Sequence, residues 1–147
     1  MILSGYTIKR LEIVRPFHFK TVLHGLSYGC SPAGYDVRLQ QALDLAPGDF
    51  MLGSILEHLL MPLDVVGSVH DKSTLARMGV ALQNTVIEPG WRGYLTVEIS
   101  NHGRERVRLP AGSPIAQILF HRTDYQCDPY AGKYQDQGPA PVAAVRG

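Results

Sequence analysis

A lysine, two hydroxyls and an arginine lie close together in the segment Asp71–Arg77. If this segment forms a short helix, its free backbone N–H groups lie beside Lys72, Ser73 and Thr74, a combination suited to binding an anion such as phosphate. Ser73 and Arg77 are four residues apart and would share one helix face, so they could serve the same ligand or the same carboxylate. The pattern is also typical of a capped surface helix with a solvated arginine, and both interpretations stay open at this point.

Two glutamates could supply acid–base chemistry. Glu88 stands at the mouth of a Pro-Gly turn, and loops of this kind often carry ligand contacts. Glu98 lies within Tyr94–Ser100, where apolar and polar residues alternate and place Glu98 on the polar face of a strand. If Arg77 lies beside that face, the two could pair and orient the carboxylate as general acid–base catalysis needs. Each glutamate is equally compatible with a solvated surface group.

The elements that must position these groups are short. The chain contains 15 glycines and 10 prolines, which interrupt short apolar runs throughout its length and favour an all-β barrel or sandwich. In the clearest strand, Leu95, Val97 and Ile99 share one face. The one expected helix, Ser73–Met78, begins with Ser73 as its N-cap and is closed by Gly79. The expected strands are Leu11–Val14, Tyr35–Leu39, Phe50–Leu60, Asp64–His70, Ala81–Ile87, Tyr94–Ser100, Arg106–Leu109 and Ile115–Arg122.

The length and composition fit one folded domain with an arm. The chain has 147 residues, of which 45% are hydrophobic and 18% charged, so it can form a core and is not a disordered chain. We assign residues 1–124 to the β-domain. The remaining residues, 125–147, are rich in Gly, Pro, Gln and Ala, and we expect a flexible arm that becomes ordered only against a partner or ligand.

The charge balance excludes some function classes. Lysine and arginine total 14 against 13 aspartates and glutamates, so the formal charge of +1 gives no general reason to bind nucleic acid or an anionic membrane. Cys30 and Cys127 lie far apart without a Cys/His cluster, which predicts neither a zinc site nor a disulfide framework. The charged N-terminus does not resemble a signal peptide, and we expect a cytoplasmic protein that does not cross a membrane.

Several familiar catalytic motifs are absent from the sequence. It contains no GxGxxG, no phosphate-binding P-loop, no HExxH and no GxSxG. The zinc deaminase signature, HxE followed by PCxxC, is also missing. Any deamination by this protein would therefore have to proceed without zinc.

Taken together, the segments resemble the dCTP deaminase family, a branch of the trimeric dUTPase-like superfamily. Six motifs follow in the family's order over most of the chain, and two further elements lie in the arm. The six are Ser31–Leu39 (SxxGYDxRL), Phe50–Ser54 with Glu57 and Met61-Pro62, Lys72–Arg77 (RSSLAR), Ile87–Trp91 with Gly93 (IDPGWxG), Leu95–Glu98 with Asn101, and Gly112 with Ile115–Gln117 (PGxxIGQ). The arm contains Pro129-Tyr130 and Lys133–Gln137, which resemble the PY and KYxxQ elements.

The resemblance implies a fold, an assembly and a reaction. The fold would be a distorted, jelly-roll-like β-barrel of the dUTPase-like type with one or two short helices. Three such subunits would form a homotrimer with nucleotide sites at the subunit interfaces, and the arm would close over a site. The reaction would be the zinc-independent hydrolytic deamination of dCTP to dUTP and ammonia, with Mg²⁺ bound through the triphosphate.

The same resemblance assigns roles to individual residues. Glu98 falls on the catalytic acid–base glutamate, Ser73 and Arg77 on the residues that position water and the carboxylate, and Glu88 on the acid that contacts the deoxyribose. Other residues fall on positions that line the substrate site or bind the nucleotide and its phosphates. These are Lys72, Thr74, Leu75, Ala76, Thr96, Val97, Tyr130, Lys133 and Gln137.

The chain departs from the family pattern at four positions. Lys72 replaces the usual arginine, which exchanges a bidentate fork for a point charge. Asp71 stands where glycine is usual, Glu88 replaces aspartate, and Asn84 stands where deaminases commonly have alanine near the cytosine pocket.

Three alternative functions stay open. A dUTP diphosphatase would use an acid at position 88 to hold its hydrolytic water, although such an enzyme has no evident need for Glu98. A bifunctional enzyme would use both Glu88 and Glu98 to deaminate dCTP and then cleave dUTP. A non-catalytic nucleotide-binding regulator would have little reason to keep Glu98, Ser73 and Arg77 together.

Overall fold

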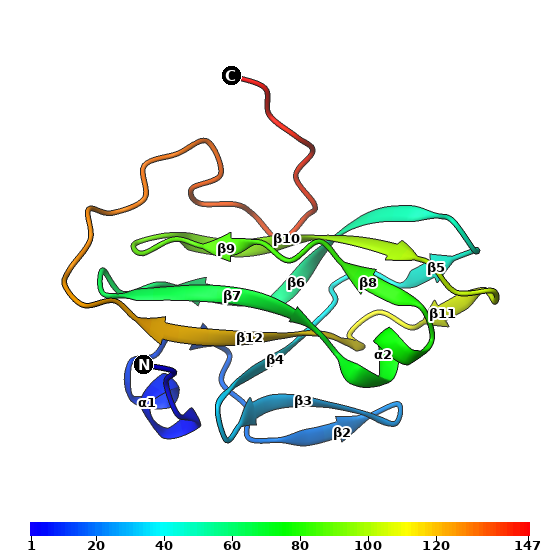
Figure 1. The fold of residues 1–147 in the computed structure, drawn as a ribbon, viewed down its shortest axis with the longest axis horizontal. Coiled ribbons are helices and arrows are strands. Elements are labelled where there is room, and N and C mark those ends of the chain that lie inside the picture. Colours follow the sequence, from blue (N-terminus) through cyan, green and yellow to red (C-terminus); the bar gives the residue numbers. More distant parts are fainter.

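Two curled β-sheets face each other and enclose the hydrophobic core (Figure 1). The computed structural model describes all residues, 1–147. One sheet has the strand order β2-β3-β4-β12-β7-β9, the other has the order β1-β6-β10-β8, and β11 pairs with β5 in a separate ribbon. The strands are β1 (Val14–Arg15), β2 (Thr21–Leu23), β3 (Leu26–Ser31), β4 (Gly34–Arg38), β5 (Leu43–Leu45), β6 (Phe50–Leu60), β7 (Val65–Asp71), β8 (Val80–Leu82), β9 (Val86–Ile87), β10 (Arg92–Asn101), β11 (Val107–Leu109) and β12 (Pro114–Arg122), and the helices are α1 (Gly5–Arg10) and α2 (Ser73–Arg77).

The core explains why these strands stack. In β7, Val65 and Val69 point inward and are buried, whereas Ser68 on the opposite face is partly exposed. The same alternation recurs in β12, where Ile118 and Phe120 are completely buried. These residues belong to one continuous cluster of 27 buried hydrophobic side chains, so the barrel forms a single cooperative unit. The expectation of an all-β fold with short helices is confirmed.

Most expected strands are present, with small differences at their ends. Phe50–Leu60 is β6 with the expected bounds, and Ile115–Arg122 begins one residue earlier as β12. Tyr94–Ser100 is extended at both ends to β10. From Ile55 in β6 and from Val97 in β10, buried residues alternate with more exposed ones, which matches the period of a strand.

The expected strand Leu11–Val14 is wrong except at its last residue. The preceding chain forms helix α1, in which the Ser4 side chain accepts a hydrogen bond from the Thr7 amide at 3.4 Å and Ile8 is completely buried. The helix has no acidic residue in its first turn and is only six residues long. Burial of Ile8 against the barrel, rather than intrinsic helix propensity, therefore stabilises it.

The expected strand Ala81–Ile87 is two strands that belong to different sheets. Its first part, β8, pairs with β10, and its last part, β9, pairs with β7, so the chain crosses from one sheet to the other between them.

A hairpin of β2 and β3 was not expected. His24 and Gly25 both have positive φ at its turn, a geometry usually signalled by Asn-Gly rather than His-Gly.

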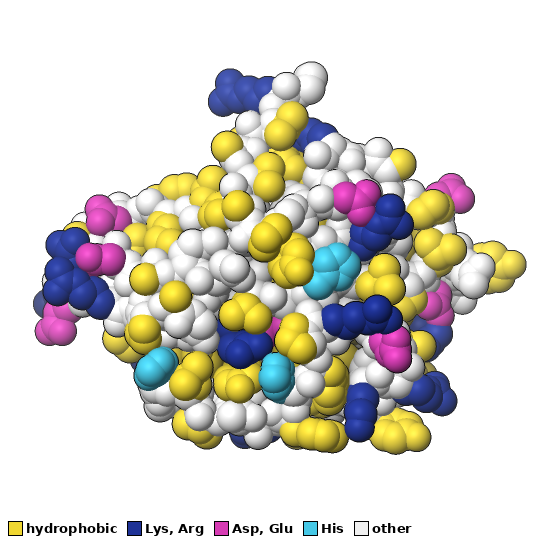
Figure 2. Space-filling model, turned by 180° about the vertical axis from the view of Figure 1, so that it is seen from behind, with side chains coloured by type: hydrophobic (Ala, Val, Ile, Leu, Met, Phe, Trp, Pro, Cys, Tyr) yellow, Lys and Arg dark blue, Asp and Glu magenta, His cyan; other side chains and the backbone are white.

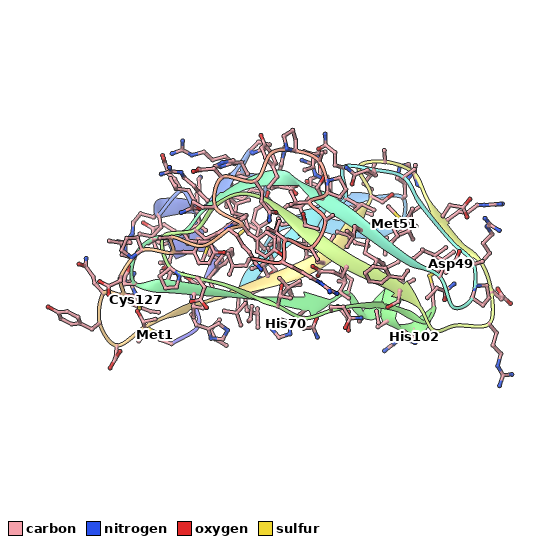
Figure 3. The ribbon with its side chains drawn as sticks, turned by 90° about the horizontal axis from the view of Figure 1, so that it is seen from above. Met1, Asp49, Met51, His70, His102 and Cys127 are labelled. Carbon is pink, nitrogen blue, oxygen red and sulfur yellow. The ribbon has the colours of Figure 1, made fainter.

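The molecule is elongated along the strands. Figure 3 shows Met1 and Cys127 at one end and Asp49 and His102 at the other. On the face shown in Figure 2, acidic side chains lie beside basic ones around the rim, and no extended patch of a single sign is visible. None of the helices is long and apolar enough to cross a lipid bilayer.

Candidate functional site

One face of the β6–β10 ladder carries alternating polar and apolar residues and lies beneath the arm. Its cross-strand pairs are Phe50 with Ser100, Leu52 with Glu98 and Ser54 with Thr96. Side chains directly opposite each other in an antiparallel ladder are in close contact. Glu98 therefore has an apolar neighbour, Leu52, where a surface glutamate would usually have water.

The register of the ladder shifts between Tyr94 and Thr96. Such a bulge changes which face the neighbouring side chains occupy. Val97 and Ile99 are buried in the core as expected, but Leu95 is only partly buried and lines a cavity together with Thr96 and Glu98. The expected strict alternation is thus broken at Leu95, and both Leu95 and Thr96 reach the cavity.

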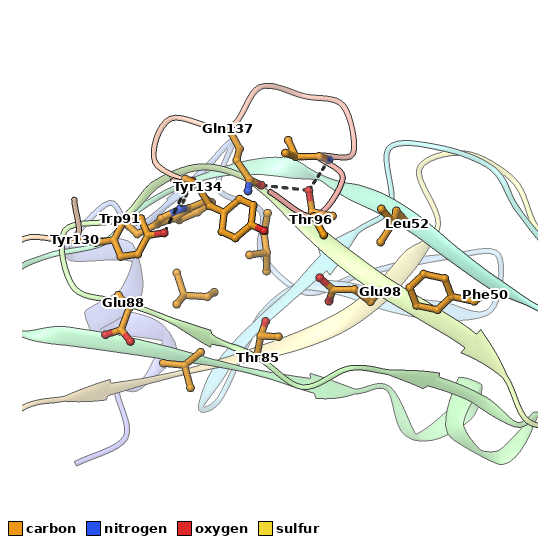
Figure 4. Close-up of a pocket in the computed structure, with 15 residues that line it drawn as sticks. Phe50, Leu52, Thr85, Glu88, Trp91, Thr96, Glu98, Tyr130, Tyr134 and Gln137 are labelled. Atoms are coloured by element: carbon orange, nitrogen blue, oxygen red, sulfur yellow. Dashed lines mark hydrogen bonds between the residues drawn. The ribbon is translucent and has the colours of Figure 1, made fainter. Parts of the chain in front are cut away.

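This cavity has a volume of about 500 Å³ and lies between β9, β10 and the arm (Figure 4). Glu98 and Glu88 both line it, and Trp91 and the rings of Tyr130 and Tyr134 close one side. The remaining lining residues are Phe50, Leu52, Thr85, Val86, Ile87, Leu95, Thr96, Gln137, Val142 and Ala144. A largely apolar cavity with a few polar groups is typical of a small-molecule site.

Glu98 is the partly buried acid of this cavity. Partial burial raises the pKa of its carboxyl above the ordinary value, and a hydrogen bond from its own backbone opposes part of that rise. The pairing with Arg77 considered from the sequence is not formed within the chain, because Arg77 is exposed and pairs with no carboxylate. Arg77 therefore does not lower this pKa within the chain, and burial is the largest influence on it. A carboxyl with a raised pKa is suited to exchange protons near neutral pH.

The arm is docked on the same barrel that contributes Glu98. The Asp136 amide donates to the Arg92 carbonyl at 3.0 Å, and the Tyr94 amide donates to the Gln137 carbonyl at 3.0 Å, so the arm extends the β10 edge. The Trp91 indole N–H also donates to the Tyr134 carbonyl at 2.7 Å. These bonds place Tyr130, Tyr134 and Gln137 over the cavity.

A second, smaller cavity of about 280 Å³ lies at the start of α2. It is lined by Lys72, Ser73 and Thr74 and, from the β2–β3 hairpin, by Lys20 and Ser27. The Lys72 ammonium is buried and donates to Asp36 Oδ2 at 2.9 Å. The other carboxylate oxygen, Asp36 Oδ1, is buried without a hydrogen-bond partner.

Helix α2 differs in detail from the expected helix. Its N-cap is Lys72, which makes no side-chain capping bond, so Ser73 is the first helical residue and not the cap. Gly79, with φ of 91°, follows the last turn as expected. Leu75 is buried in the core, whereas Ala76 and Arg77 are exposed to solvent.

The sequence-predicted site residues are thus divided between two places. Glu88, Thr96, Glu98, Tyr130 and Gln137 line the larger cavity. Lys72, Ser73 and Thr74 line the smaller one. The Leu75 and Val97 side chains are buried in the core, so only their backbones could meet a ligand. Lys133 is exposed on the arm, where its ammonium donates to the Val145 carbonyl.

Several lining residues were not singled out from the sequence. Phe50, Leu52 and Ser54 lie two residues apart along β6, and this period of two could have placed all three on the face of the ladder that Glu98 shares. Tyr134 lies within the KYxxQ-like element Lys133–Gln137, but only the docking of the arm brings it to the cavity. No group of three His, Cys, Asp or Glu side chains converges to form a metal site.

Comparisons with known proteins agree with this architecture. The sequence model of the dCTP deaminase-like family matches residues 35–123. A protein of Methanoculleus marisnigri named "dCTP deaminase, dUMP-forming" is 42% identical over 105 residues, which cover 67% of this chain and 56% of that protein. Another of the same name from Methanoregula boonei is 36% identical over 138 residues, covering 90% of this chain and 70% of the relative. The dCTP deaminase of Campylobacter fetus is 32% identical over 160 residues, covering 86% of each chain.

Solved structures agree in fold. The 2'-deoxycytidine 5'-triphosphate deaminase of Agrobacterium tumefaciens superposes with a TM-score of 0.68 at 20% identity, over 82% of this chain and 48% of that one. The EIAV dUTPase superposes with a TM-score of 0.57 at 20% identity, over 69% of this chain and 85% of that one. This chain therefore spans about half the length of the Methanoculleus and Agrobacterium proteins. The match over more than half of its sequence shows that the chain belongs to the dCTP deaminase-like family.

Proposed function

We propose that the protein catalyses the zinc-independent hydrolytic deamination of dCTP to dUTP and ammonia. The observation that carries this proposal is the carboxyl of Glu98, which lies in a largely apolar cavity without a cationic partner and has a raised pKa. Relatives named dCTP deaminase support the substrate class. A deoxynucleotide substrate and two free cysteines are consistent with a cytoplasmic protein.

Glu98 would act as general base and then as general acid. The ionised carboxylate takes a proton from a water molecule whose oxygen attacks C4 of the cytosine ring, and it delivers that proton to N3. A tetrahedral intermediate with an amino group and a hydroxyl at C4 results. Glu98 then moves the hydroxyl proton to the amino nitrogen, the C4–N4 bond breaks, and ammonia leaves with the uracil nucleotide as the other product.

The proposed active site is completed by a neighbouring subunit in a homotrimer. Within one chain, Ser73 and Arg77 belong to a surface separate from the cavity that Glu98 lines. Because Arg77 is exposed and has no carboxylate partner, it is free to approach Glu98 of another copy. There Ser73 would position the attacking water and Arg77 would orient the carboxylate, while interface burial would exclude bulk water.

The phosphates would be bound by groups from both cavities. We assign Lys72 and Thr74 from the α2 region and Tyr130, Lys133 and Gln137 from the arm to nucleotide binding. Mg²⁺ would be carried on the triphosphate, where it neutralises phosphate charge. The chain offers no cluster of three acidic or imidazole side chains for the ion, which fits a metal held through the nucleotide.

A specific observation keeps a bifunctional enzyme as the second candidate. Glu88 lines the same cavity as Glu98 but is exposed at its mouth. Two of the relatives are named as dUMP-forming. In that case Glu88 would activate a second water that cleaves dUTP to dUMP and pyrophosphate.

The deciding experiment incubates the purified protein with Mg²⁺ and either dCTP or dUTP and follows ammonia and pyrophosphate in parallel. Ammonia from dCTP without pyrophosphate supports the deaminase. Both products from dCTP identify the bifunctional enzyme, and pyrophosphate from dUTP alone identifies a dUTP diphosphatase. If neither ammonia nor pyrophosphate is released, the result contradicts an enzymatic role and leaves a nucleotide-binding regulator.

Mixing variant subunits tests the shared active site. The variants Arg77→Ala and Glu98→Gln should each be inactive as homotrimers. Subunits exchanged by mild denaturation and refolding should recover part of the activity, because some interfaces then combine an intact Arg77 with an intact Glu98. No recovery in trimers shown by native mass spectrometry to be mixed would contradict a site shared between subunits.

A further inference from the structure

The hydroxyl of Thr96 lies between two groups of the arm (Figure 4). The Val142 amide donates to Thr96 Oγ at 3.0 Å, and Thr96 Oγ lies 3.2 Å from Gln137 Oε1. Thr96 is 8% exposed, so water cannot readily replace either partner. The bond to Gln137 is therefore more than a surface contact of a flexible side chain.

The Thr96 hydroxyl accepts one of these bonds and donates the other. It accepts from the Val142 N–H, which can only donate, and its single hydrogen is directed to Gln137 Oε1. Only the carbonyl oxygen of the Gln137 amide can accept that hydrogen. The amide nitrogen, with its two hydrogens, is thus the free end, and Figure 4 shows it on the side of Tyr134, a residue that lines the cavity.

A second buried hydroxyl holds the same stretch of the arm. Ser54, the cross-strand partner of Thr96, is completely buried and donates to the Pro139 carbonyl at 3.2 Å. The Pro139 carbonyl can only accept, so Ser54 must donate to it, and Ser54 Oγ in turn accepts from the Gln41 side-chain amide at 2.9 Å. The Ser54 hydroxyl hydrogen is therefore directed to the arm, just as that of Thr96 is.

We propose that Thr96 is a positioning residue that orients the Gln137 amide so that its NH₂ group donates to an acceptor oxygen of the bound nucleotide. This inference rests on the proposed function for the identity of the ligand but on the hydrogen bonds alone for the orientation. The acceptor is either a phosphate oxygen or the pyrimidine carbonyl. Comparison of dCTP with deoxycytidine distinguishes them, because only the pyrimidine carbonyl is shared by both.

The hydrogen bond from Val142 to the Thr96 hydroxyl, which begins the relay to Gln137, is tested first without nucleotide. The measurement is hydrogen exchange of the Val142 amide by NMR. Thr96→Val keeps the shape of the side chain but removes the hydroxyl, so exchange at Val142 should become at least about tenfold faster. Thr96→Ser keeps the hydroxyl and should retain protection. Unchanged exchange in Thr96→Val would overturn the relay, whether or not the protein is an enzyme.

The role in binding is tested by calorimetric titration with dCTP in a Glu98→Gln background, which prevents turnover. Thr96→Val should weaken binding about tenfold, as expected for the loss of one hydrogen bond to a charged or strongly polar group, whereas Thr96→Ser should stay within about twofold. Ser100→Ala, on the same face of β10, is the matched control and should bind as the parent does.

A double-mutant cycle separates positioning from general damage. In a Gln137→Ala background, Thr96→Val should cause almost no further loss, because Thr96 acts through Gln137. Fully additive losses, or unchanged affinity of Thr96→Val, would overturn the proposal. If wild-type protein binds dCTP with this pattern but releases no ammonia, the deaminase proposal fails and the positioning role stands. If it binds no dCTP, the nucleotide role of Thr96 also fails.

Discussion

The β6–β10 ladder contains two glutamates that are shielded from water in different ways. Glu57, near one end of β6, is completely buried, and its two oxygens accept from the Arg38 amide at 2.9 Å and the Arg38 guanidinium at 2.8 Å. Glu98, on β10, is partly buried beside a cavity and has no cationic partner. Burial raises the pKa of both carboxyls. A raised pKa therefore does not by itself identify a functional acid.

The two regions differ in whether the glutamate has a counter-ion and whether a cavity lies beside it. Arg38 connects β4 to β6 through Glu57, and its guanidinium also stacks on the Tyr28 ring at 4.5 Å. No ligand can reach this carboxylate, because Glu57 is completely buried and both of its oxygens are hydrogen-bonded to Arg38. Glu98 faces room for a small molecule instead. The comparison indicates a structural role for Glu57 and supports the catalytic role proposed for Glu98.

The largest expected effect is on turnover. Glu98→Gln keeps the size and polarity of the side chain but removes the proton-accepting group, so the rate of ammonia release from dCTP should fall about 10³-fold. Thermal stability and dCTP affinity should remain near the wild-type values. Glu105→Gln, on an exposed loop, is the control and should be fully active. Substantial deamination by the Glu98 variant would contradict its proposed role.

The next effect is on stability. Glu57→Gln leaves the Arg38 guanidinium without its buried counter-ion, and the free energy of unfolding should fall by about 3 kcal/mol. Denaturant unfolding followed by Trp91 fluorescence measures this loss. Asp44→Asn, which breaks the exposed pairs with Arg106 and Arg108, is the matched control and should change stability far less. Equal losses in the two variants would remove the distinction between buried and exposed pairs.

The pH dependence of stability should report the titration of both glutamates, whereas the pH dependence of activity should report that of Glu98. Between the ordinary glutamate pKa of about 4.3 and the raised native values, the folded protein binds more protons than the unfolded chain. Stability should therefore fall as pH rises through that window. Activity should rise over the same range, because Glu98 must be ionised to accept the proton from water.

Variants assign these titrations. In Glu57→Gln, the free energy of unfolding should change less with pH, because the titration of Glu57 is removed. The rise of kcat/KM with pH should remain, because Glu98 is unchanged. Chemical unfolding and steady-state kinetics, each measured as a function of pH, distinguish the two titrations. An acidic limb with its midpoint at or below the ordinary glutamate pKa would show that burial does not govern Glu98 in the assembled enzyme.

The smallest effect concerns the other buried ion pair, Lys72 with Asp36. A lysine satisfies only one carboxylate oxygen, which leaves Asp36 Oδ1 without a partner. Lys72→Arg offers a planar fork that can reach both oxygens, so it should raise the free energy of unfolding by about 1 kcal/mol. Lys20→Arg, in the same cavity but exposed, should leave stability unchanged. A loss in Lys72→Arg would show that the cavity cannot accept the larger head group.

The sequence predicted the strands that alternate strongly and failed where tertiary contacts override local pattern. Phe50–Leu60 was predicted with its final bounds, and from Ile55 onward its buried and more exposed residues alternate with a period of two. Helix α1 was missed because burial of Ile8, and not propensity, stabilises it. The separation of β8 from β9 was missed because their pairing partners, β10 and β7, lie in different sheets.

For the candidate site, the sequence by itself determined the chemical groups and the faces of the strands they occupy. The order of the motifs indicated Glu98 and the α2 residues, because residue type and spacing are properties of the chain. Only the tertiary structure decided that Leu52 lies opposite Glu98, that Arg77 is not its partner within one chain, and that Thr96 meets Gln137. These are contacts between segments distant in sequence, and their geometry depends on sheet register and on the docking of the arm, which no local pattern encodes.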